Sequence, residues 1–364
     1  MYLLYINYIS MLHNRTSAAF DNLRMTCIFN ARLIYFANQL QKLAQNRAPG
    51  GKSMRKNRGT RVRNYFFAFS MAALMSIAVG AASAQPKKPV LTVAVSIPPM
   101  QEWVNRLAGD RVAVTLIMPP GSSPHAFEPS PRQLVELGKA QVWFSIGVDF
   151  EYSLKPKVRA MYPNLEIVDV TKNVQFRTLE PQEQEEEHKV DEENIDPALT
   201  NRDQHTWLGY SQAKAEIAVI RDTLMVLDPE GASLYKANYE TYMKEIDIVF
   251  DSLKTKLAPL SGSKVFVYHP AFGYFLDTFN IIQVAVELGG KEPTQKDLVA
   301  LVDLAKKEKA KAIFTQAQFS ENAAKAVAGA IGAVVIPIDP LAVDWLANVS
   351  RLGEAMLKAV PGGK

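Results

Sequence analysis

The sequence predicts an α/β protein with two βα lobes, each built on a parallel sheet, joined by one long rigid helix. Short β-branched runs alternate with helical segments in both halves of the chain, which is typical of right-handed βαβ units. An uninterrupted helical pattern separates the two halves. Histidine and aspartate side chains follow several of the predicted strands, where open parallel sheets collect their ligands. We therefore expect a ligand site in the cleft between the lobes.

The first 84 residues are expected to lie outside this fold. From Met54, a basic region precedes an apolar stretch at 65–79 and the small-residue motif Ala82-Ser83-Ala84, the order of a secretory signal peptide. A membrane anchor is the alternative, but an apolar run of about 15 to 18 residues is short for a bilayer span. We expect residues 54–84 to be a cleaved signal peptide and the product to be periplasmic. Residues 1–53 look like a dispensable upstream extension.

The charge of the whole chain is misleading for the same reason. Residues 1–84 hold 11 of the 41 lysines and arginines but 1 of the 37 acidic residues. The remainder therefore has 30 basic and 36 acidic side chains, a net charge of −6. The formal charge of +4 thus gives no support for nucleic-acid binding. The single cysteine, Cys27, lies upstream of the cleavage motif, so we expect neither a disulfide nor a lipid-attached cysteine afterwards.

The N-terminal α/β lobe is expected over residues 85–228. Its predicted strands are 90–96, 112–118, 142–146 and 166–170, and its predicted helices are 100–107, 131–139 and 211–227. A loop at 180–196 interrupts the lobe with nine acidic residues, one lysine and His188. Such a block repels itself and should be mobile. It is either a solvated acidic loop or a loose metal-capture segment.

The linker helix and the C-terminal α/β lobe complete the mature chain. Apolar and aromatic residues spaced by four and three predict a rigid helix over 229–258, because this spacing places them on one face. In the lobe at 259–364, we expect strands at 265–268, 281–288, 312–315 and 334–338. We expect helices to begin after Thr294 and after Ser320, both of which can cap a helix, and a last helix at 343–359.

Four side chains form a candidate metal site. His125 and Asp339 follow predicted strands, His269 directly follows another, and His205 precedes a helix. Three imidazoles and a carboxylate match a tetrahedral Zn²⁺ site, whereas Mn²⁺ prefers more oxygen ligands. The spacing carries no local motif, and each histidine alone is as compatible with a non-ligand role. Glu128 is expected to face solvent or to support His125, and Trp207 to fill the core under the site.

Six segments carry a resemblance to a known family. They are SIPPMQEWVNRLAGDRV near the mature start, PHAFEPSPRQL around His125, QHTWL around His205, YHPAFGYF around His269, TQAQFS at 315–320 and IDPLA around Asp339. In these segments the chain resembles the metal-binding proteins of ABC importers, in particular their zinc-uptake branch. The resemblance covers residues 89–357.

This resemblance implies a fold and a site. It implies two lobes bridged by a long helix with little hinge motion, and metal held between them. His125, His205 and His269 match the three histidine positions of the family, and Asp339 matches its carboxylate. A histidine at 269 favours zinc, because manganese-selective relatives tend to carry a carboxylate there. Two departures, Gln204 in place of a proline and Gln316 in place of a glutamate, bear on affinity and selectivity.

The predicted function is capture of Zn²⁺ in the periplasm and its delivery to an ABC permease, which an ATPase serves indirectly. We expect a monomer that binds no nucleic acid and is not an enzyme. The ATPase must be a separate protein, since this chain has no G-x-x-x-x-G-K-[ST] loop to hold a nucleotide. A manganese or iron importer of the same family is one alternative. A secreted zinc hydrolase is another, although H-E-x-x-H and G-x-S-x-G motifs are missing from the sequence. A metal-dependent adhesin is a third.

Overall fold

The computed structural model describes residues 89–179, 202–287, 294–316, 318–319 and 321–359. All of them belong to one compact unit, residues 84–364. The predicted signal peptide, the upstream extension and the acidic loop with His188 lie outside the described residues. Along the described part of the chain, no helix has both the length and the hydropathy to cross a bilayer.

The N-terminal lobe is built on a parallel sheet whose strands lie in the order β2-β1-β3-β4. These strands are β1 (Leu91–Val95), β2 (Val112–Leu116), β3 (Val142–Ser145) and β4 (Glu166–Asp169). β1 and β3 form the centre and are buried almost throughout. Each strand lies within one of the predicted strand ranges, and the central strands read as continuous apolar runs because a strand buried on both faces needs no polar alternation.

Four helices belong to this lobe. They are α4 (Pro98–Ala108), α5 (Pro131–Leu137), α6 (Asp149–Met161) and α7 (Tyr210–Leu227). Ser130 and Gln133 form a capping box at the start of α5, which fixes the end of the proline-rich loop that carries His125. α6 was not predicted from the sequence, since Pro156 inside the helix hides its pattern.

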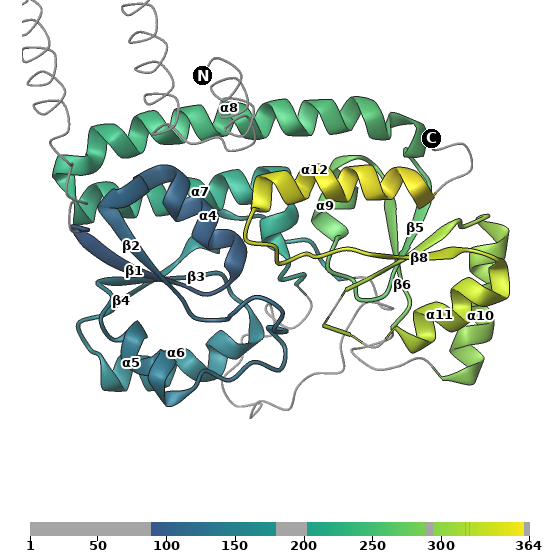
Figure 1. Ribbon diagram of the computed structural model, residues 1–364, viewed down its shortest axis with the longest axis horizontal. Helices are drawn as coiled ribbons and strands as arrows, with labels where there is room; N and C mark the ends of the chain where they lie inside the picture. The colour runs from purple at the N-terminus through teal and green to yellow at the C-terminus, as the bar shows by residue number, and fades with distance from the viewer. Residues whose placement is uncertain (1–88, 180–201, 288–293, 317, 320, 360–364) are drawn as a thin grey trace, which may run out of the picture. The chain divides into compact units, whose positions relative to one another are not determined.

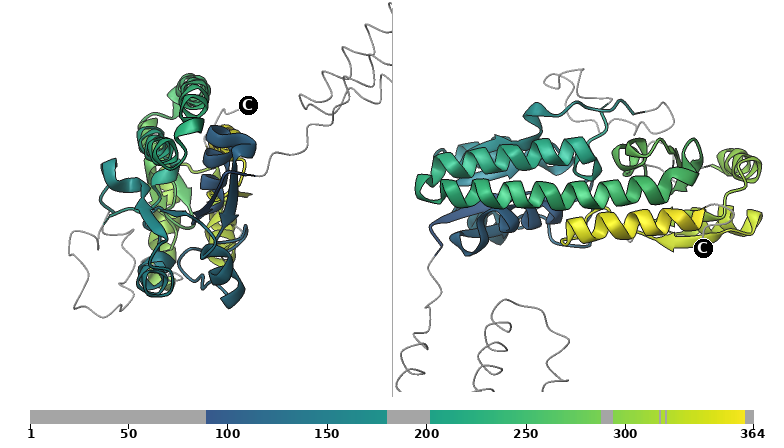
Figure 2. Two further views of the ribbon diagram at one scale, coloured as in Figure 1. Left: turned by 90° about the vertical axis from the view of Figure 1, so that its left-hand side faces the viewer. Right: turned by 90° about the horizontal axis from the view of Figure 1, so that it is seen from above.

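One long helix, α8 (Ala232–Leu257), joins the lobes (Figure 1). Its 26 residues give a length of about 39 Å at about 1.5 Å per residue. It packs against α4 and α7 of the first lobe and against α12 (Trp345–Met356) of the second. Figure 2 shows α7 and α12 lying alongside it. The predicted connecting helix is thus observed, with the two lobes held along its length.

The C-terminal lobe repeats the arrangement of the first. Its parallel sheet has the order β6-β5-β7-β8, with β5 (Lys264–Val267), β6 (Ile282–Ala285), β7 (Ala312–Thr315) and β8 (Val334–Pro337). Its further helices are α9 (Gly273–Thr278), α10 (Gln295–Lys307) and α11 (Asn322–Ile331). Thr294 caps α10 as predicted. α11 begins at Asn322 with Glu321 at its N-cap position, and the predicted cap Ser320 lies outside the described residues.

Tryptophans connect the lobes beside the cleft. The Trp345 indole N–H donates to the carbonyl of Trp207 at 2.7 Å, and the Trp207 indole N–H donates to the carbonyl of Pro340 at 2.8 Å. The ring of Trp345 also meets that of Trp103 edge-on, with centroids 5.6 Å apart. The segment after His205 is therefore bonded to the second lobe through buried donors, which fixes one wall of the cleft.

Candidate metal centre

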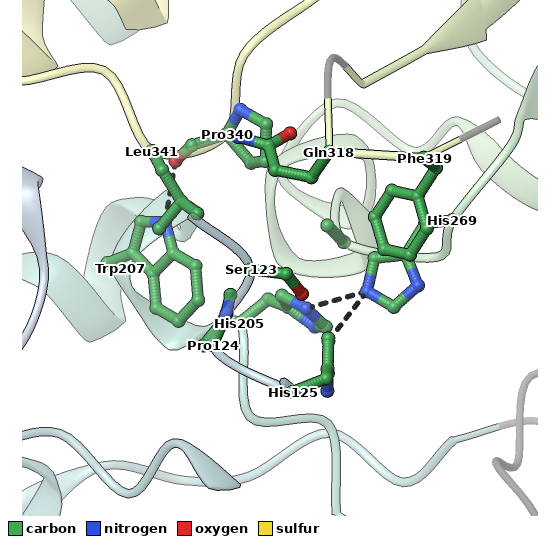
Figure 3. Close-up of a pocket in the computed structure, with 11 residues that line it drawn as sticks. Ser123, Pro124, His125, His205, Trp207, His269, Gln318, Phe319, Pro340 and Leu341 are labelled. Atoms are coloured by element: carbon green, nitrogen blue, oxygen red, sulfur yellow. Dashed lines mark hydrogen bonds between the residues drawn. The ribbon is translucent and has the colours of Figure 1, made fainter. Parts of the chain in front are cut away.

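Three histidines from three different loops converge between the lobes (Figure 3). His125 lies in the loop after β2, His205 precedes α7, and His269 follows β5. The Nε2 atom of His269 lies 3.1 Å from Nε2 of His125 and 3.2 Å from Nε2 of His205. Among the described residues, these three form the group of possible metal ligands, with ligand atoms within 4.8 Å of one another.

Each imidazole is oriented by a carboxylate at its other nitrogen. Nδ1 of His125 lies 2.7 Å from Asp149 Oδ2, and Nδ1 of His205 lies 2.9 Å from Asp203 Oδ1. Nδ1 of His269 contacts Glu287 Oε1. An Nδ1–H that donates to a carboxylate leaves Nε2 as the electron-pair donor, which is the usual arrangement of metal-binding histidines.

Sequence reasoning did not identify these carboxylates as partners. Asp149 lies just beyond β3 at the start of α6, and Glu287 lies just beyond β6. Both positions follow the carboxyl ends of parallel strands, so the rule that pointed to the histidines also covers them. Asp203 lies two residues before His205. The missing information was which carboxylate faces which ring.

His269 is the most deeply enclosed of the three. Burial lowers the pKa of His269 well below its ordinary value, and the nearby His125 and His205 lower it further. The ring of Phe319 stacks on it with centroids 4.6 Å apart. Gln316 holds its backbone, accepting from the His269 N–H at 3.3 Å and donating to its carbonyl at 2.9 Å. His269 is therefore a fixed, neutral nitrogen donor at pH 7.

Hydrogen bonds and an ion pair around Asp203 hold the His205 loop. Asp203 Oδ1 accepts from the backbone N–H of His205 at 2.9 Å, and Asp203 Oδ2 pairs with Arg177 at 3.2 Å. The Tyr274 hydroxyl donates to the carbonyl of Asp203 at 2.8 Å. Arg177 also reaches Asp277 in the second lobe at 3.0 Å. These bonds fix the orientation of the carboxylate that orients His205.

The structure does not bring Asp339 into the histidine group. Its Oδ1 accepts from the backbone N–H of Leu341 at 2.8 Å, as in an Asx turn. The next two residues, Pro340 and Leu341, do line the pocket. Glu128 is exposed, as expected, and Trp207 is buried beside His205 with ring centroids 5.3 Å apart.

The pocket around the histidines has the size of an ion site. Its volume is about 10 Å³, which is about the room that one water molecule needs. Pockets for organic ligands are typically some hundreds of Å³. Three imidazole nitrogen donors with one position left to fill suit a late first-row cation such as Zn²⁺.

Comparison with known proteins agrees with this geometry. The family model described as zinc-uptake complex component A, periplasmic (ZnuA), matches residues 93–357. The chain belongs to the ZnuA family. A crystal structure of ZnuA is 30% identical to this ZnuA-family chain, with a TM-score of 0.66, and the match covers 74% of this chain and 98% of that one.

Curated relatives of this ZnuA-family chain carry the names of two metals. The high-affinity zinc uptake system protein ZnuA of Bacillus subtilis is 26% identical over 69% of this chain and 78% of its own length. The manganese-binding lipoprotein MntA of Halalkalibacterium halodurans is 25% identical over 64% of this chain and 73% of its own. The family comprises periplasmic metal-binding proteins of transport systems rather than enzymes, so the hydrolase alternative does not hold.

Proposed function

We propose that this protein captures Zn²⁺ in the periplasm and hands it to an ABC-type permease in the inner membrane. The observation that carries the proposal is the group of three imidazoles whose Nε2 atoms face one another while each Nδ1 meets a carboxylate. In the proposed site, His125, His205 and His269 are the metal ligands. Asp339 stays a prediction for the fourth position.

The donor set supports zinc over manganese. All three convergent donors are imidazole nitrogens, and the nearest carboxylates are turned to the Nδ1 atoms instead of the pocket. Mn²⁺ usually takes more oxygen ligands, whereas Zn²⁺ is well served by three histidines and one further donor. The manganese-binding relative keeps manganese as the second candidate ion.

Location and delivery rest on family membership. The family description is periplasmic, and the sequence before Gln85 has the pattern of a cleaved signal peptide. The Bacillus subtilis relative is named as a zinc uptake system protein, and uptake across a membrane requires a permease. We expect the zinc-loaded protein to pull down the permease from membranes of cells that co-express it. Membranes without the permease serve as the control and should give no such capture.

The first prediction concerns the three histidines. Changing any one of them to alanine should weaken zinc binding about 10²-fold or more, because a water molecule does not replace an imidazole donor at equal strength. The measurement is elemental analysis of protein purified without metal-affinity resin, followed by competition of Zn²⁺ against Mn²⁺. We expect one zinc per wild-type chain and retention of zinc in the presence of manganese.

Two comparisons sharpen this test. Glu128→Ala changes an exposed residue three positions from His125 and should leave affinity unchanged. Asp339→Ala tests the fourth position, and weaker binding in that variant would support the carboxylate as a ligand. A wild-type protein that retains no metal, or one that prefers manganese, would contradict the proposed ion.

A further inference from the structure

The first turn of α12 is capped by a side chain from the other lobe. Its N-cap residue, Asp344, directs its carboxylate to Arg351 at 2.7 Å and makes no cap bond within this described stretch. The backbone N–H of Leu346 donates instead to Glu102 Oε2 at 3.2 Å. Glu102 lies on α4 of the first lobe, beside the start of α12 (Figure 1). An N–H group at a helix start needs an acceptor, and a carboxylate there also meets the positive end of the helix dipole.

The same carboxylate is bonded to the long connecting helix. Glu102 Oε1 accepts from the hydroxyl of Tyr242 on α8 at 3.0 Å. Glu102 is half-buried, so water competes for these bonds less than it does at an exposed position. One side chain therefore joins three helices, namely α4, which carries it, α8, which spans both lobes, and α12, which belongs to the second lobe.

The turn that Glu102 caps holds two walls of the histidine pocket. Trp345 donates its indole N–H to the carbonyl of Trp207, and Asn348 donates its side-chain amide to the carbonyl of Asp339 at 2.6 Å. Trp207 lines the pocket, and so do the two residues that follow Asp339. Both bonds start from the first four residues of α12. A displacement of this turn would therefore disturb both walls together.

We propose that Glu102 is a positioning residue that controls how fast the three-histidine site releases its ion. The inference rests on the proposed zinc-binding function. While the carboxylate caps α12, the start of this helix keeps both pocket walls in place around the ion. Loss of the cap leaves the N–H of Leu346 without its acceptor, so the turn opens more often and the walls separate with it. The effect reaches the site through α12 and leaves the donor set unchanged.

The test compares Glu102→Ala with Asp344→Ala in the full-length, zinc-loaded protein. Both carboxylates lie at the start of α12, but that of Asp344 pairs with Arg351, so Asp344→Ala is the matched control. Stopped-flow mixing with an excess of a chromophoric chelator measures the rate of zinc dissociation. We expect Glu102→Ala to release zinc about tenfold faster, because hydrogen bonds to charged groups are the strong ones and their loss acts mainly on dissociation. Asp344→Ala should release zinc at the wild-type rate.

Two further readouts separate positioning from a general loss of stability. Glu102→Gln should restore slow release, because its amide oxygen can accept from Leu346 while its NH₂ group can donate to the Tyr242 hydroxyl. Hydrogen exchange at the Leu346 amide should be faster in Glu102→Ala and unchanged in Asp344→Ala. The visible spectrum of the Co²⁺-loaded protein should be the same in every variant, since the ligands of the ion are not altered.

A milder variant covers the case in which alanine prevents folding. Glu102→Asp keeps the charge but shortens the side chain by one carbon, so it should lose the bond to Leu346 and speed zinc release as well. If the aspartate variant releases zinc as slowly as the wild type while the Leu346 amide exchanges faster, the inference is wrong.

Other outcomes would also overturn the inference. Wild-type release from Glu102→Ala would mean that the cap is lost without effect on the site. Equal acceleration by Asp344→Ala would assign the effect to charge at the helix start in general. Failure of the wild-type protein to bind zinc would instead contradict the proposed function itself. Zinc titration of the wild type comes first, and amide exchange at Leu346 is measured without the ion, so the two failures remain distinguishable.

Discussion

The carboxyl group of Glu216 lies in an environment that disfavours its charged form. It lies wholly buried in α7, and neither carboxylate oxygen has a hydrogen-bond partner among the described residues. Burial raises the pKa of Glu216 to about 8, and the charge of Asp169 adds to the shift. At neutral pH the side chain is therefore a neutral acid in the folded protein and an anion in the unfolded chain.

We predict that Glu216→Gln stabilises the protein at neutral pH. Because the folded pKa is raised, the wild type loses stability as the pH rises from about 4.5 to about 8. At pH 7 the gain should be on the order of 3 kcal/mol. The measurement is the free energy of unfolding of both proteins from pH 4 to 9. A difference that stays constant with pH would contradict this account.

At the scale of elements, the contact between α12 and α8 leaves no room for a larger side chain. A Cβ atom at Gly353 of α12 would collide with the side chain of Leu253 on α8. Gly329 on α11, by contrast, is exposed and faces open space. The two helical glycines therefore have different roles, close packing in one case and none in the other.

Substitution at these glycines should change stability in opposite directions. Gly353→Val should lower the free energy of unfolding by about 1 to 3 kcal/mol through overpacking. Gly329→Ala should raise it by about 0.5 to 1 kcal/mol, because alanine is the better helix residue. Denaturant titration of both variants measures this. A neutral Gly353→Val would mean that α12 can move away from α8 without cost.

The sequence was sufficient for most elements but not for the pairing of side chains. β-branched runs identified every described strand, and spacing identified α8. α6 was missed because of Pro156, and α9 because its six residues are too few to show a period. The histidines could be predicted because they follow strands or precede a helix. Their carboxylate partners and the bond of Asp339 to Leu341 depend on side-chain direction, which composition and spacing do not determine.

At the scale of the compact unit, the two lobes are joined by more than one connection. α8 runs along both, α12 packs on it from the second lobe, and the indoles of Trp207 and Trp345 bond across the cleft. Arg177 adds an ion pair to Asp277. Opening the cleft would require breaking several of these contacts together.

We therefore predict that metal binding changes stability but not size. Zinc at about one hundred times its dissociation constant should add about 2.7 kcal/mol to the free energy of unfolding. The radius of gyration from small-angle X-ray scattering should be the same with and without zinc. Expansion of the metal-free protein would show that the contacts across the cleft are weaker than the structure indicates.

The convergence of the histidine rings has a consequence for unloading. The Nε2 atoms of His125 and His205 lie 3.1 and 3.2 Å from that of His269, and a carboxylate holds each ring at Nδ1. Because the folded chain itself fixes the rings, the conformational entropy of assembling the cage is lost during folding instead of at capture. The same preorganisation removes the entropy that a loosening cage would regain on release. Dissociation is then slow unless external work distorts the cage, and that work must come from outside this chain.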